Sequence, residues 1–152
     1  MKKNILLSIF LLLMVSFTSQ GQYLSAGDLA FLSVNSDNAD EFTVVLMVDL
    51  PGGTIFHVTD NGFVDPVTGR TGEGFLTFTT PAEGYTKGQV FTWANGMSIS
   101  GTPWNSASPT NFAFNASGDQ LFLFQGSTSN WTTQTGITLL AGMHYSGGTW
   151  IT

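Results

Sequence analysis

The clearest alternation of apolar and polar residues lies between Asp40 and Asp60. Apolar side chains recur at every second position from Phe42 to Leu50, which places them on one face of a β-strand. Residues 54–59 are rich in the β-branched and aromatic side chains that favour strands. Pro51-Gly52-Gly53 stands between the two runs and is typical of a tight turn. The pattern therefore predicts a β-hairpin over Asp40–Asp60.

The second face of the first strand is also apolar at Val45 and Met47, which favours a central strand covered on both sides. Asp60–Gly74, with four Gly, is expected to form a long loop, and Asn95-Gly96 is expected to close a hairpin onto residues 97–100. Other short apolar runs predict strands at 28–34, 75–80, 89–94, 112–115, 120–125, 137–145 and 148–152. Short strands at regular spacing predict an all-β fold, an Ig-like antiparallel β-sandwich of about seven to nine strands.

Composition agrees with this fold class. Charged residues make up only 9% of the chain and Gly occurs 18 times, whereas no apolar stripe with helical spacing extends over three turns. The absence of Cys excludes disulfides, so about 130 residues must be stabilised by their own core.

The first 21 residues have the layout of a cleaved signal peptide. Lys2 and Lys3 precede an apolar run over residues 5–15 that is too short to span a bilayer. Small residues then favour a cut before Gln22, so that residues 22–152 form the mature β-sandwich domain. An uncleaved membrane anchor is less favoured. We expect secretion or a place at the cell surface, with no membrane insertion after cleavage.

The net charge of the chain limits the kinds of partner that it can bind. Without Lys2 and Lys3 the chain has two basic and 10 acidic residues, a formal charge of −8. Such a chain is unsuited to nucleic acid and to an anionic membrane surface, which both require clustered Lys and Arg. It is compatible with calcium, an extracellular protein or a polysaccharide.

Four motifs stand out: Asp40-Glu41-Phe42, Thr59-Asp60-Asn61-Gly62-Phe63, the Gly69–Gly74 stretch and Ser117-Gly118-Asp119-Gln120. Together they resemble a domain found near the N-terminus of large bacterial secreted and cell-surface proteins, which is distantly similar to the lamin-tail, Ig-like β-sandwich. Phe63 stands where such domains often have Trp. The signal peptide resembles those of Bacteroidetes. The resemblance implies a non-catalytic structural or adhesive module and supplies no catalytic residue. The terminal Trp150-Ile151-Thr152 favours equally a truncated domain that continues and a complete domain ending on an edge strand.

Two acidic loops are candidate calcium sites. Asp37 and Asp40 lie in the first, and Asp60, Asp65 and Glu73 in the second. Calcium takes six to eight oxygen ligands of these types, although neither loop matches an EF-hand. The alternative is that these side chains form Asx turns and caps. Because the loops flank the predicted hairpin, they are expected to lie together at the end opposite Pro51-Gly52-Gly53.

Three further residues are candidate ligand-binding groups. Arg70 could bind a carboxylate or sugar, or form an ion pair within its acidic loop. Trp104 and Trp131 could stack on sugar rings in a carbohydrate-binding module, or fill the ends of the sandwich.

Catalytic patterns are missing from the sequence. His57 and His144 are the only histidines and lack zinc-site spacing. There is no Cys and no G-x-S-x-G motif. We therefore expect no enzyme activity and no catalytic residue.

Overall fold

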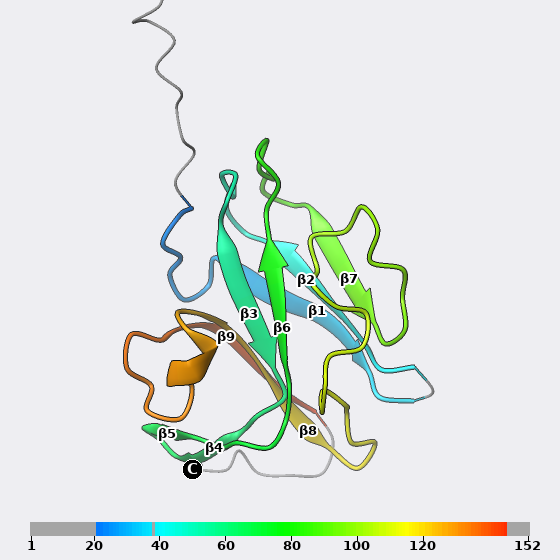
Figure 1. Ribbon diagram of the computed structural model, residues 1–152, viewed down its shortest axis with the longest axis vertical. Helices are drawn as coiled ribbons and strands as arrows, with labels where there is room; N and C mark the ends of the chain where they lie inside the picture. The colour runs from blue at the N-terminus through cyan, green and yellow to red at the C-terminus, as the bar shows by residue number, and fades with distance from the viewer. Residues whose placement is uncertain (1–20, 38, 146–152) are drawn as a thin grey trace, which may run out of the picture.

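The computed structural model describes residues 21–37 and 39–145, and the chain there is all-β (Figure 1). Its elements are β1 (Leu29–Asn35), β2 (Glu41–Leu46), β3 (Ile55–Thr59), β4 (Phe63–Asp65), β5 (Thr68–Gly69), β6 (Phe75–Thr79), β7 (Val90–Ala94), β8 (Asp119–Gln125), the 3-10 helix η1 (Thr128–Asn130) and β9 (Thr138–Tyr145). Residues 1–20 of the predicted signal peptide and the predicted strand at 148–152 lie outside the described residues.

The strands form two antiparallel sheets that face each other as in a β-sandwich. One has the order β1-β2-β7 and the other β6-β3-β8-β9, while β4 and β5 form a separate small hairpin. Alternate side chains of both sheets point into one shared core. This core contains Phe42, Val44 and Leu46 of β2, Phe56 and Val58 of β3, Leu76 and Phe78 of β6, Trp93 of β7, and Leu121 and Leu123 of β8.

The predicted hairpin over Asp40–Asp60 is wrong. Strand β2 pairs with β1 and β7, whereas β3 pairs with β6 and β8 in the other sheet. Residues 47–54 therefore cross between the sheets, and the amide of Thr54 donates to the Pro51 carbonyl in the turn. Period-two alternation identifies the buried face of each strand but not its partner, and a turn can join two sheets as well as two neighbouring strands.

Some of the other strand predictions are confirmed and some are wrong. The predictions at 28–34, 75–80, 89–94, 120–125 and 137–145 are confirmed within one or two residues. Residues 97–100 and 112–115 are not strands, and the long loop after Asp60 contains β4 and β5. In the 112–115 segment, Phe112 and Phe114 are buried, but their backbone lies outside both sheets. Apolar alternation alone therefore did not distinguish a strand from a buried loop.

A second apolar cluster covers part of the outer face of the four-stranded sheet. It contains Phe122, Phe124 and Trp131, with Phe63, Phe75 and Ile137 against it. This cluster explains why β8 is apolar on both faces, as an internal strand should be. By contrast, Met47 is exposed, so the first strand of the predicted hairpin is central in its sheet but is not covered on both sides.

The loop tips 50–53 and 80–85 are joined by their backbones. Leu50 and Tyr85 exchange two hydrogen bonds of 2.8 and 2.7 Å. Gly84 has a φ of +71°, and a Cβ there would overlap the Leu50 carbonyl oxygen. Only glycine fits both requirements.

We expect Gly84→Ala to destabilise the fold more than Gly88→Ala. Gly88 has a φ of +87° with nothing within 4 Å of a Cβ, so it reports the cost of the left-handed backbone alone, about 1 kcal/mol. Gly84→Ala adds a collision with backbone, and we expect an additional loss on the order of 2 kcal/mol in the free energy of unfolding. Urea denaturation measures both. Equal losses would contradict the close contact.

Candidate functional site at the acidic end of the sandwich

Both acidic loops reach one end of the sandwich, as expected from their positions before β2 and after β3. Asp40 and Asp60 accept hydrogen bonds from neighbouring amides, those of Phe114 and Ala113. The crossover between β2 and β3 accounts for this placement, because it brings the chain back to the end from which it started.

A third aspartate completes the arrangement. Three consecutive amides donate to three carboxylates: Ala113 to Asp60 at 2.9 Å, Phe114 to Asp40 at 3.0 Å and Asn115 to Asp119 at 3.1 Å. The Tyr145 hydroxyl donates to the Asn115 carbonyl at 3.1 Å. We call Asp40, Asp60 and Asp119 with segment 113–115 the carboxylate clamp. It satisfies backbone donors that no sheet reaches.

The clamp holds two aromatic side chains in the end of the core. Phe112 lies with its ring centroid 5.0 Å from that of Trp93, edge to face. Phe114 lies 5.4 Å from Phe112. The sequence alone does not predict Asp119 as a site residue. Its signals there, the Ser117-Gly118-Asp119 turn and a place in one of the motifs that carry the resemblance, do not show that Asp119 approaches Asp40 or Asp60.

The second acidic loop is closed by side chains that bond its own backbone. The second oxygen of Asp60 accepts a hydrogen bond from the Gly74 amide at 3.0 Å. The Asn61 side-chain oxygen accepts one from the Glu73 backbone amide at 3.2 Å. Asp65 accepts from the Val67 amide at 2.9 Å, which is an Asx turn. These contacts are of the kind expected if the acidic side chains form Asx turns and caps and do not bind calcium.

Burial dominates the electrostatics of this end. Asp60 is only 1% exposed. Burial raises its pKa to about 7, the Ala113 amide opposes this, and the charge of Glu73 adds to it. Burial likewise raises the pKa of Asp119 and of Glu73. Near neutral pH, the Asp60 carboxyl, which accepts hydrogen bonds from two backbone amides, is therefore partly protonated.

No group of three or more His, Cys, Asp or Glu side chains is placed to hold a metal ion in residues 21–37 and 39–145. The calcium sites proposed from Asp37, Asp40, Asp60, Asp65 and Glu73 stay a prediction that only binding measurements test.

The three candidate ligand-binding residues have different environments. Arg70 is exposed, and its charge lowers the pKa of Glu73, as a neighbour in the same loop would. Trp104 and Trp131 are 3% and 1% exposed. The Trp104 indole donates to the Thr92 carbonyl at 3.1 Å, and Trp131 belongs to the outer cluster. Their burial leaves neither ring face open to a sugar.

His57 lies on the outer face of the four-stranded sheet. His57 Nδ1 is 3.0 Å from the Thr77 hydroxyl, and its ring lies 5.1 Å from that of Phe124. Burial lowers its pKa. His57 is thus a half-buried strand residue held between Thr77 and Phe124.

Comparison with protein-family models, with curated proteins and with solved structures finds no match in any of the three. In the part of the chain that the structure describes, no helix is long and apolar enough to cross a membrane.

The raised pKa of Asp60 predicts that stability falls as pH rises towards neutrality. The folded carboxyl keeps its proton up to about pH 7, whereas the unfolded one releases it near 3.8. The folded state thus binds more protons between these values, and the stabilisation present below about pH 4 is lost as pH rises through 7. We expect a loss on the order of 4 kcal/mol from this residue.

Urea denaturation between pH 4 and pH 8 (about the span of the two pKa values) measures this dependence. We expect Asp60→Asn to remove most of it and to leave the smaller part that the raised pKa values of Asp119 and Glu73 contribute. Asp65→Asn, a change in an exposed Asx turn, should leave it as in the parent chain. A slope as steep in Asp60→Asn as in the parent chain would assign the dependence to other groups.

Calcium provides a second test of the acidic end. Because both oxygens of Asp60 already accept backbone hydrogen bonds, we expect the same melting temperature in chelator and in millimolar Ca²⁺. Calcium at about 100 times its Kd would instead add about 2.7 kcal/mol of stability. A rise of several degrees would show a calcium site.

Proposed function

We propose that this chain is a non-catalytic extracellular module of the Ig-like, lamin-tail-like type, with a structural or adhesive role. In this proposal it is exported by its N-terminal signal peptide and forms the N-terminal part of a larger secreted or surface protein. The observation that carries the proposal is the carboxylate clamp. Acidic side chains that could have been ligands are used to hold the polypeptide together.

The motifs that carry the family resemblance agree with a structural role. Asp40, Asp60 and Asp119 belong to the clamp, and Asn61 and Gly74 bond in the adjoining loop. A pattern of residues that bond backbone amides preserves a fold and does not require a reaction.

A carbohydrate-binding module is the second candidate. Burial of Trp104 and Trp131 removes the aromatic platform first considered, but one aromatic side chain stands in solvent. Tyr23 is 94% exposed and lines a groove with several polar side chains. This observation supports a polysaccharide partner, because a sugar ring can stack on an exposed aromatic face.

Export tests the first proposal. Expression of the full chain in a bacterium that secretes such proteins should place it outside the cytoplasm, with a mature N-terminus at Gln22 or within a few residues of it. Mass spectrometry of the secreted chain gives the terminus. A chain kept in the cytoplasm with residues 1–21 intact would contradict the proposal.

A further inference from the structure

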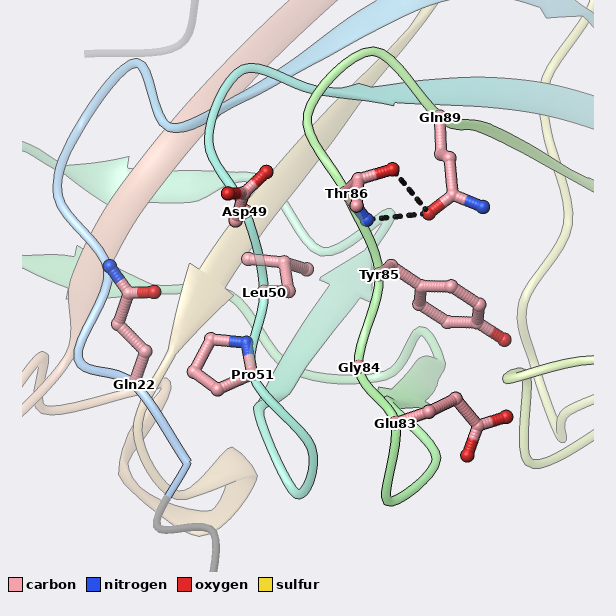
Figure 2. Close-up of a pocket in the computed structure, with 9 residues that line it drawn as sticks. All are labelled: Gln22, Asp49, Leu50, Pro51, Glu83, Gly84, Tyr85, Thr86 and Gln89. Atoms are coloured by element: carbon pink, nitrogen blue, oxygen red, sulfur yellow. Dashed lines mark hydrogen bonds between the residues drawn. The ribbon is translucent and has the colours of Figure 1, made fainter.

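Two grooves meet at Gln22, at the end of the sandwich opposite the carboxylate clamp. The larger has a volume of about 730 Å³ and lies across the loop tips 49–51 and 83–89. In Figure 2, Gln22 lies on one side of the 49–51 segment and the 83–89 segment lies on the other. The smaller, of about 480 Å³, extends over the outer face of the four-stranded sheet. Gln22 lines both grooves, and we call the two grooves together the track.

Hydrogen-bonding side chains line the larger groove, and internal contacts fix several of them. Asp49 accepts from the Lys87 amide at 2.7 Å, and Gln89 accepts from the Thr86 amide at 2.6 Å. Each bond uses one polar atom of the side chain. The second Asp49 oxygen and the Gln89 side-chain nitrogen make no hydrogen bond within the described residues. The Asp49 oxygen can therefore accept a hydrogen bond from a ligand, and the Gln89 nitrogen can donate one.

An aromatic ring and a carboxylate complete this groove. The Tyr85 ring is held 4.5 Å from that of Phe91 and 6.0 Å from that of Phe78. The charge of Glu83 acts on its hydroxyl, although burial is the larger reason that the Tyr85 pKa is raised. The two hydrogen bonds between Leu50 and Tyr85 make the wall rigid before any ligand arrives, which reduces the entropy lost on binding.

The smaller groove adds an exposed aromatic side chain. Tyr23 is the most exposed large apolar side chain of the described residues, at 94%. Its backbone is nevertheless fixed, because the Gln125 side chain donates to Gln22 at 2.8 Å and accepts from Leu24 at 2.8 Å. The fold thus holds an aromatic ring in water beside His57 and Thr77. Nothing in the packing of the core requires this.

We propose that this track binds an uncharged polysaccharide, with Tyr23 stacking on one sugar ring and Asp49, Glu83 and Gln89 bonding the hydroxyls of others. No Lys or Arg side chain lines either groove. Cleavage before Gln22 would add one α-amino charge where the grooves meet, but Asp49 and Glu83 outnumber it and disfavour acidic sugars. Vicinal hydroxyls both donate and accept, which suits carboxylate and amide side chains. The inference rests on the second of the proposed functions and locates its site.

Affinity electrophoresis of the secreted chain tests the track. The gels contain, in turn, a β-glucan, a xylan, a mannan and an α-glucan, with alginate as the acidic comparison. We expect retardation by at least one uncharged polysaccharide and none by alginate. A cationic polysaccharide is unsuitable, since it would bind any protein with a formal charge of −8.

Two variants locate the binding. Tyr23→Ala removes a side chain that packs on almost nothing, so we expect an unchanged melting temperature and about tenfold weaker binding. Glu83→Ala should weaken binding several-fold. The matched controls lie in the three-stranded sheet: Leu32→Ala, at a side chain 57% exposed, and Glu41→Ala should bind as the parent does.

Absence of retardation by every uncharged polysaccharide overturns the inference, and so does equal loss in the control variants. Retardation by alginate alone also overturns it. A secreted, folded chain that binds no polysaccharide would remove the track and the carbohydrate-binding candidate on which it rests, and would leave the structural module in place. Failure of export would instead contradict the proposed function itself.

Discussion

The end of the core depends on the three carboxylates that hold the backbone of residues 113–115 in place. Phe112 and Phe114 are buried there, whereas Ala113 and Asn115 are exposed, and no neighbouring strand pairs with this backbone. The Ala113 and Phe114 amides are part-buried, and an amide that is fully buried without a partner costs about 1–3 kcal/mol. Asp40, Asp60 and Asp119 each satisfy one of the three amides. The cost of burying the carboxylates is visible in the pKa of Asp60, which burial raises to about 7.

This constraint separates the two ends of the sandwich by role. At the clamp end, acidic side chains are occupied by the protein's own backbone and aromatic rings are enclosed. At the opposite end, the loop tips are joined through Leu50 and Tyr85, and polar side chains and the Tyr23 ring face solvent. Rigid loops with exposed polar groups are where extracellular β-sandwiches can recognise ligands without changing their core.

The sequence predicted the class and most strands because burial leaves a local trace. The alternation from Phe42 to Leu46 reports one buried face, and the continuous apolar run at residues 121–124 reports two. The pairing of strands leaves no such trace, so the alternation predicts β2 and β3 as hairpin partners, whereas they lie in different sheets. Phe112 and Phe114 show the same limit, since alternate burial arises in a loop when side chains satisfy its amides.

By itself, the sequence determined an all-β chain with a large apolar core, a pronounced acidic charge and no disulfide. It also showed that two acidic loops flank one pair of strands, and it therefore predicted that the two loops meet at one end of the sandwich. Only the tertiary structure decided that Asp119 joins them, that Trp104 and Trp131 are enclosed, and that Tyr23 is held in solvent by Gln125. The physical reason is that hydrogen bonds and ring contacts between residues 30 to 100 positions apart depend on the crossing of the chain between sheets, which local pattern does not encode.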